Sequence, residues 1–383
     1  MENNYTIQDV FLKFGASFIK ENKLSTEQWK VFNAILNCKT KELGYHTITC
    51  EECGETIKGY NSCRNRHCPM CQNYAREKWI KKENENLLDC PYFHIVTTIP
   101  IELNDLVLYN KKIMYNILFK ATSESILELA NDSKWLGAKV GITSILHTWG
   151  QTMELHPHIH SIVTGGGIKD NQWINSKENY LFKVQVLSSL FKGKFLGLLK
   201  KEKIIFPEKL KHLNEEKAFN KFLEILYKKQ WITYIEPPKG SPENVIEYIG
   251  RYSFRIAISN YRIKNITNED VTFEYKDYKD NGNIKLMTIT GIEFIRRFLM
   301  HVLPDYFTKI KHYGLFTNRN KKALIELCRN LIKKLNFNTY IRKKHKRKLY
   351  ELTCQKCGNN KFIYSYYYSR PDINRRLLAI GNI

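Results

Sequence analysis

Hydrophobic residues recur at helical spacing near the start of the chain. Val10, Phe14 and Phe18 lie on one side of such a helix, which predicts an amphipathic helix over Ile7–Glu21. A capping-box pattern that begins at Ser25 predicts a second helix, which runs to about residue 37. The chain therefore opens with a helical pair.

The pattern changes to strands in the middle of the chain. Tyr92–Ile99 is rich in β-branched and aromatic residues, and Ala138–His147 and His158–Val163 read as two strands joined by a short loop. We expect Gly165 to Gly167 to end the second of them. The other elements that we expect are helices over Tyr74–Leu88, Leu106–Leu129, Val184–Lys201 and Glu215–Lys229, a strand over Trp231–Ile235, and a hairpin around the turn Asp280–Gly282.

The charge of the chain points to a polyanionic partner. It has 383 residues, which suits two or three domains, and a formal net charge of +23. Neutralised phosphates release counterions, so this excess favours nucleic acid over a ribosomal or membrane surface. The 23 Tyr and 20 Phe add surface on which unpaired bases can stack.

No apolar run is long enough to span a bilayer, and the first residues do not resemble a secretory signal. We therefore expect a cytoplasmic protein, associated with the nucleoid and with no membrane partner. In a reducing compartment the ten cysteines point to metal binding and not to disulfides.

Two C-x-x-C pairs predict a structural zinc site. Cys50 and Cys53 form the first pair, and Cys68 and Cys71 form the second, with fourteen residues between the pairs. Two such pairs complete a tetrahedron of thiolates around Zn²⁺, which leaves no open position for catalysis.

Two further zinc-capable residues, Cys63 and His67, lie between the pairs. They could belong to a different choice of four ligands, hold a second ion, or be a buried thiol and a surface imidazole. Near the other end of the chain, Cys354 and Cys357 form half of a zinc site. That half could be completed by distant cysteines such as Cys90 or Cys328, or it could bind nothing.

Three histidines alternate along the predicted strand that contains Ile159. Because alternate side chains of a strand share a face, His158 and His160 point the same way. His156, just before Pro157, is the least secure member of the series. Two imidazoles on one face can hold one divalent ion and leave positions open for substrate oxygens.

A third ligand for this ion is expected from the neighbouring strand or from the loop. Gln151, His147 and Glu154 are all within reach if the two strands form a hairpin. We rank Gln151 first and His147 second.

Two tyrosines lie four residues apart on a predicted helix that follows a Ser-Pro-Glu-Asn start. Tyr248 and Tyr252 therefore share one helical face, and each has an arginine three residues on, Arg251 and Arg255. Tyrosines at this spacing are often the edge of a hydrophobic core. A guanidinium beside each phenol favours the phenolate and can grip a phosphate, which makes these tyrosines candidate nucleophiles.

The His-Ile-His motif and the later Tyr-x-x-x-Tyr helix, in this order, resemble the two-tyrosine HUH transposases, which are the rolling-circle enzymes of insertion sequences. The resemblance covers nearly the whole chain. It includes residues 61–72 (NSCRNRHCPMCQ), residues 248–260 (YIGRYSFRIAISN), and the later segments FIRRFLMHVLPDYF and KHYGLF. Relatives with a single tyrosine exist, so the resemblance does not by itself require both phenols.

The resemblance implies an α+β fold with an HUH-type catalytic domain, in which helices flank an antiparallel sheet and Tyr92–Ile99 is the central strand. It implies a helical zinc-binding domain over 1–90, the catalytic domain over 91–300, and a basic helical region over 301–383.

The resemblance also implies a reaction. Mg²⁺ or Mn²⁺ on the histidines would polarise a phosphate at the end of a mobile element, and one tyrosine would attack it to leave a 5′-phosphotyrosine on single-stranded DNA. The second tyrosine would take the second strand end. The alternatives are a rolling-circle replication initiator and a non-enzymatic zinc-ribbon protein that binds DNA.

Overall fold

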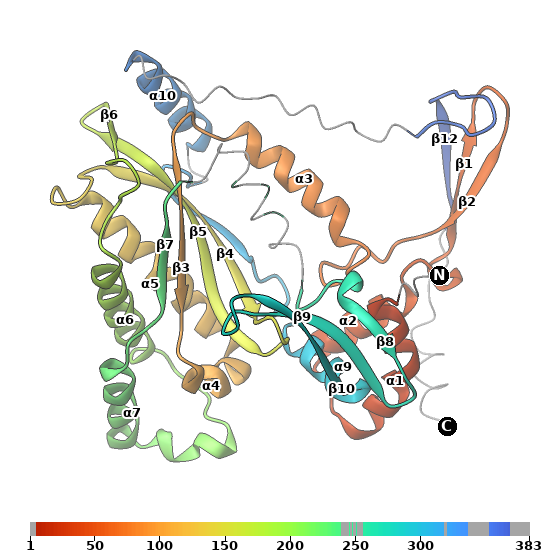
Figure 1. The fold of residues 1–383 in the computed structure, drawn as a ribbon, viewed down its shortest axis with the longest axis horizontal. Coiled ribbons are helices and arrows are strands. Elements are labelled where there is room, and N and C mark those ends of the chain that lie inside the picture. Colours follow the sequence, from red (N-terminus) through yellow and green to blue (C-terminus); the bar gives the residue numbers. More distant parts are fainter. Residues whose placement is uncertain are drawn as a thin grey trace. The chain divides into compact units, whose positions relative to one another are not determined.

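The computed structural model describes residues 5–238, 245, 247, 250, 256–317, 320–335 and 352–367 (Figure 1). The chain folds into two compact units, and neither is continuous in sequence. One unit, here called the terminal unit, consists of Met1–Ala75, Phe254–Val302 and Lys343–Ile383. The other, here called the sheet unit, consists of Arg76–Ser253 and Leu303–Arg342. This division interleaves the segments that the sequence predicts as three consecutive domains.

Three helices form the core of the terminal unit: α1 (Ile7–Glu21), α2 (Thr26–Asn37) and α9 (Gly291–Met300). The first two begin at full capping boxes, as the sequence predicts for the second of them. The apolar face of α1 packs on both partners, because the Phe11 ring lies 5.2 Å from that of Phe32 and 5.5 Å from that of Phe298.

Two three-stranded antiparallel sheets complete the terminal unit. The first has the order β12-β1-β2, and the second has the order β10-β9-β8. Asn281 and Gly282 both have positive φ at the turn between β9 and β10, which confirms the predicted hairpin. The strands are β1 (Tyr45–Cys50), β2 (Thr56–Tyr60), β8 (Ile263–Ile266), β9 (Asp270–Asp277), β10 (Asn283–Thr290) and β12 (Phe362–Tyr367).

An antiparallel sheet of order β11-β4-β5-β3-β7 is the framework of the sheet unit, and β6 pairs with the far end of β5. The predicted strand β3 is an interior strand, but the middle position belongs to β5, which pairs with both β4 and β3. The strands are β3 (Tyr92–Thr98), β4 (Lys139–Trp149), β5 (Leu155–Lys169), β6 (Gln172–Asn175), β7 (Thr233–Glu236) and β11 (Ile310–Gly314).

Helices cover both faces of this sheet. Ile126 of α5 and Leu187 of α6 pack with Val163 of β5 on one face. Ile80 of α3 and Ile325 of α10 pack on the other face with Ile162 of β5. The helices of the unit are α3 (Gln72–Glu85), α4 (Asn104–Tyr109), α5 (Lys111–Asn131), α6 (Val184–Leu199), α7 (Glu216–Lys228) and α10 (Lys321–Lys334). The observed architecture is therefore α+β, as predicted.

Three elements differ from the prediction. The single helix expected over Leu106–Leu129 is divided into α4 and α5, because the buried Asn110 side chain between them bonds the backbone of Ile205. The Asn110 amide donates to the Ile205 carbonyl at 2.7 Å and accepts from the Ile205 N–H at 2.8 Å. The three glycines do not end β5, which continues to residue 169. The last third of the chain, expected to be helical, also contains β11 and β12.

Candidate functional site

Three histidines from two neighbouring strands form a cluster on the sheet. His158 and His160 share one face of β5, and the register places His147 of β4 directly opposite His158. One ring nitrogen from each of the three lies within 4.8 Å of the others. This spacing suits one divalent ion held by three imidazoles, with its remaining positions open to substrate.

The hydrogen bonds of the cluster select the ligand nitrogens. His158 Nδ1 lies 2.6 Å from the carbonyl oxygen of His156, so Nδ1–H donates and Nε2 keeps its lone pair. His160 Nδ1 lies 2.8 Å from His94 Nε2, and His94 Nδ1 lies 3.1 Å from the carboxylate of Glu236. Since His94 donates to that carboxylate, its Nε2 accepts from His160. The Nε2 of His160 is then also available to a metal.

His147 supplies a direct test of whether a metal fits. Its Nε2 is buried and has no hydrogen-bond partner among the described residues. A buried polar atom of this kind costs free energy unless it is paired, and a divalent cation would satisfy it. Removal from water, with a smaller contribution from neighbouring histidines, lowers the pKa of His147, of His160 and, to about 3, of His158. All three imidazoles are therefore neutral at physiological pH, which is the form that binds metal.

The geometry brings His147 to the third position. Gln151, the candidate that the sequence ranks first, lies in the turn beyond Trp149↔Leu155, the last residue pair between β4 and β5, and its role as a ligand stays a prediction. His156 is not one of the three grouped histidines. Its backbone carbonyl orients His158 instead.

The predicted nucleophiles Tyr248 and Tyr252, with Arg251 and Arg255, lie outside the described residues. Residues 245, 247 and 250, which come shortly before or between them in the sequence, are described and are helical. Val245 packs in the hydrophobic cluster that contains Ile162. A Cβ on Gly250 would lie 2.6 Å from the Ile80 side chain.

Both of these contacts lie on the histidine face. His158, His160 and Ile162 alternate along β5 and point to the same side of the sheet. Val245 therefore lies on the side of the sheet that carries the three histidines, and Gly250 lies against α3, which covers that side.

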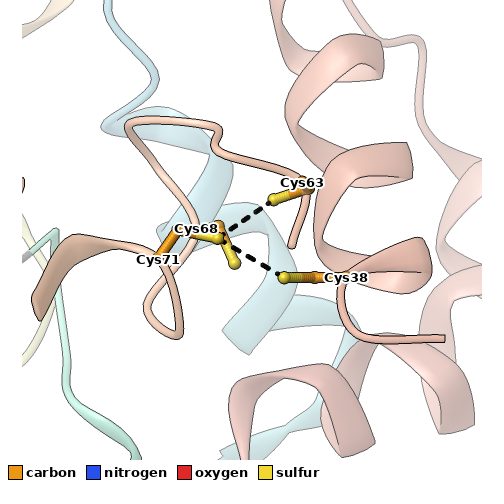
Figure 2. Close-up of side chains that lie close together, drawn as sticks. All are labelled: Cys38, Cys63, Cys68 and Cys71. Atoms are coloured by element: carbon orange, nitrogen blue, oxygen red, sulfur yellow. Dashed lines mark hydrogen bonds between the residues drawn. The ribbon is translucent and has the colours of Figure 1, made fainter. Parts of the chain in front are cut away.

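Four cysteines converge in the terminal unit (Figure 2). Cys38 follows the end of α2, and Cys63, Cys68 and Cys71 come from the loop before α3. The sulfur of Cys71 lies 3.5 Å from that of Cys38 and 3.6 Å from that of Cys63. Sulfur donors at these distances suit a closed tetrahedral zinc site, which stabilises the fold and does no catalysis.

The predicted set of four zinc ligands was wrong in its grouping. Cys50 and Cys53 do not join Cys68 and Cys71, because the β1–β2 hairpin carries the first pair to its own turn. Their sulfurs instead face those of Cys354 and Cys357. Of the two further candidates, Cys63 belongs to the first cluster, whereas His67 belongs to neither cluster.

Sequence reasoning missed Cys38, His94 and Glu236. Cys38 has no partner at C-x-x-C spacing, so its only sequence signal is its position at the C-terminal cap of a predicted helix. His94 lies on the predicted strand β3, and the alternation of that strand gives it a face but no partner. Only the pairing of β3 with both β5 and β7 brings His94 between His160 and Glu236.

Among the helices that the structure describes, none combines the length and apolar character of a membrane-spanning segment.

Comparison with known proteins identifies two family matches and two relatives. Residues 10–99 match a family described as a transposase zinc-binding domain, and residues 141–324 match one described as "Putative transposase". The chain is 41% identical to "Putative transposase y4qJ" of Sinorhizobium fredii over 85% of this chain and 84% of the relative. It is 28% identical to the transposase for insertion sequence element IS801 of Pseudomonas savastanoi pv. phaseolicola, over 79% of this chain and 74% of the relative. No solved structure matches the chain significantly. The chain therefore belongs to the family of insertion-sequence transposases that join an IS91-type zinc-binding domain to a Y2-type transposase domain.

Proposed function

We propose that this transposase cleaves and rejoins single-stranded DNA at the ends of its mobile element through a covalent 5′-phosphotyrosine link. Tyr248 and Tyr252 are the proposed nucleophiles. The observation that carries the proposal is that Val245 packs on the histidine face of the sheet, and that Gly250 packs against α3, which covers that face. These two described neighbours of the tyrosines support a nucleophile on the same side of the sheet as the metal centre.

The histidine cluster supports a role for Mg²⁺ or Mn²⁺. His147, His158 and His160 would hold the cation through their Nε2 atoms, with the tautomers set by the hydrogen bonds of His94 and His156. The ion would supply charge stabilisation to the scissile phosphate.

The proposed step keeps the phosphodiester energy in a covalent bond. A tyrosine oxygen forms a bond to phosphorus as the bond from phosphorus to O3′ breaks. The phenolic proton is lost to solvent, and the leaving O3′ gains a proton to become a free 3′-hydroxyl. Attack by a 3′-hydroxyl on the phosphotyrosine reverses these bond changes, so rejoining needs no ATP.

The two arginines give the tyrosines equivalent surroundings in the sequence. Arg251 follows Tyr248 by three residues, and Arg255 follows Tyr252 by the same interval. A guanidinium can stabilise a phenolate and bind a phosphate through two hydrogen bonds. Because each tyrosine has its own arginine, this repeated spacing supports a mechanism in which each tyrosine attacks one of the two strand ends.

The test is a covalent-adduct assay with labelled single-stranded oligonucleotides from the element's ends. The double variant Tyr248→Phe, Tyr252→Phe should form no adduct, because phenylalanine retains the ring and removes only the nucleophile. Each single variant should still form an adduct with one oligonucleotide but fail to complete two-ended transfer. Tyr278→Phe, a change at an exposed tyrosine of the terminal unit, is the control and should behave as wild type.

An adduct that survives in the double variant would refute the assignment. A double variant that loses DNA binding together with the adduct would instead favour a DNA-binding protein without this chemistry. Binding is therefore measured on the same samples by fluorescence anisotropy.

A further inference from the structure

The sulfurs of Cys50 and Cys53 in the terminal unit lie against those of Cys354 and Cys357. The Cys50 sulfur lies 3.5 Å from that of Cys357, and the Cys53 sulfur lies 3.6 Å from that of Cys354. All four sulfurs lie within 4.8 Å of one another. In a tetrahedral site with Zn–S bonds of about 2.3 Å, neighbouring sulfurs are about 3.8 Å apart, so the observed spacing suits one zinc ion.

The two C-x-x-C turns have the same backbone structure. In each turn the glycine after the second cysteine, Gly54 or Gly358, has a positive φ, and its N–H bonds the carbonyl of the first cysteine at 3.0 or 2.8 Å. The N–H of that first cysteine in turn bonds the carbonyl of the residue after the glycine, at 2.9 or 2.8 Å. A shared loop of this kind holds both thiols of each pair on one side, as a zinc knuckle requires.

The sheet around these cysteines has little other source of stability. Along β1, β2 and β12 the one buried residue is Cys50, while Ile57, Ile363 and Tyr364 are about half exposed. Three strands without an apolar core are marginal in water, so a bound ion would stabilise the sheet. One ion pair, between Lys356 and Glu55, also joins the two turns, but it is exposed and weak.

We propose that Cys50, Cys53, Cys354 and Cys357 bind a second structural zinc ion, which joins residues near the two ends of the chain into one zinc ribbon. The site is separate from the cluster of Cys38, Cys63, Cys68 and Cys71, and each ion completes its own tetrahedron.

Zinc content per chain tests the proposal. The purified full-length protein should contain two zinc ions per chain by inductively coupled plasma mass spectrometry. The double variant Cys354→Ala, Cys357→Ala should contain one, and Cys63→Ala, Cys71→Ala should also contain one. A matched control is Cys90→Ala, Cys328→Ala, which removes two buried cysteines that lie outside both clusters and should keep two ions.

A zinc content that the Cys354 and Cys357 substitutions leave unchanged would overturn the proposal, whatever the total in wild type. The alternative is that the four cysteines form two disulfides, which is tested by titrating the thiols of denatured wild type without reductant. All ten thiols should react, and four unreactive cysteines would also overturn the proposal. Replacement of zinc by Co²⁺ adds a readout in the folded protein. The visible spectrum of wild type should equal the sum of the spectra of the two single-site variants.

Discussion

The Glu236–His94–His160 chain determines which nitrogen of His160 faces the candidate metal. The two hydrogen bonds of this chain are 3.1 and 2.8 Å long. When His94 is neutral, its Nδ1–H donates to Glu236 and its Nε2 accepts from the Nδ1–H of His160. Burial lowers the pKa of His94, although the Glu236 carboxylate opposes the shift. The neutral form that the hydrogen bonds require is therefore also the form that burial favours.

His94→Phe should weaken Mn²⁺ binding by about 10–100-fold, because it retains a ring but removes the acceptor for His160 Nδ1–H. Isothermal titration with Mn²⁺ measures the loss without any DNA present. The control His312→Phe changes another partly buried histidine of the sheet unit, which bonds Thr143 and lies outside the cluster. Equal affinities of His94→Phe and wild type would show that His94 does not orient the ligand.

Metal binding should also resist acid. An exposed histidine with a pKa near 6.5 is about nine-tenths protonated at pH 5.5, so a site of three such residues would lose about 1,000-fold in affinity between pH 7.5 and 5.5. The pKa values of His147 and His160 are lowered well below the ordinary value and that of His158 is about 3, so protons do not compete in this range. We expect a change of less than about 10-fold in Mn²⁺ affinity, measured by titration at both pH values. A 1,000-fold loss would mean that the histidines are hydrated and titrate normally.

At the scale of elements, the glycines of β5 show how backbone contacts shape the sheet. A Cβ on Gly167 would lie 2.4 Å from the backbone carbonyl oxygen of Lys139, and one on Gly166 would lie 2.7 Å from the Trp173 ring. The neighbouring strands β4 and β6 approach so closely that no side chain fits. The triple glycine therefore marks close strand packing and not the end of a strand.

Gly167→Ala should lower the free energy of unfolding of the sheet unit by about 1–3 kcal/mol, because a backbone carbonyl cannot move aside as a side chain can. Gly193→Ala is the matched control, because this glycine lies inside α6 with no atom within 4 Å of the added Cβ. It should raise stability by about 0.5–1 kcal/mol. Urea unfolding followed by circular dichroism measures both changes, and a Gly167 variant as stable as wild type would contradict the close packing.

Elements with local signals could be predicted from the sequence, whereas pairings between distant segments could not. The capping box at Ser25 and the hairpin turn at Asn281 depend on residues close to one another in the chain, and both were predicted correctly. The pairing of β12 with β1 joins segments about 300 residues apart, and neither strand alternates strongly enough to specify a partner. The zinc ligands were grouped wrongly for the same reason.

The histidine site was predictable to the extent that it follows from alternation along one strand. His158 and His160 could be paired from their spacing, but the choice between His147 and Gln151 depends on the register of β4 against β5. A register shift lies between residues 147 and 149, and sequence patterns do not reveal such irregularities.

At the scale of the whole molecule, the net charge of +23 governs how tightly any DNA strand is bound. The longest basic run, residues 342–348, contains six Lys and Arg and lies outside the described residues. Each phosphate that it neutralises adds about 0.7 to the slope of log affinity against log salt for a single strand.

Replacement of the six cationic residues of 342–348 by glutamine should make this slope shallower by up to about 4, measured by fluorescence anisotropy with a single-stranded oligonucleotide between 50 and 200 mM salt. The control replaces Lys201, Lys203 and Lys209, which are exposed but interspersed with Glu202 and Glu208. It should change the slope by less than about 1. An unchanged slope in the first variant would show that the basic run does not contact DNA.

The separation of the two cysteine turns has a consequence for synthesis on the ribosome. Cys50 and Cys357 are 307 positions apart, and Cys53 and Cys354 are 301 apart. At about 5–20 residues per second, the first dithiol emerges roughly 15–60 s before its partner is translated. Throughout that interval the nascent chain can complete the cluster of Cys38, Cys63, Cys68 and Cys71 but not the ribbon. A transcript broken before codon 354 thus yields a protein that lacks the second zinc ion, which distinguishes the product of a truncated copy of the element from that of an intact one.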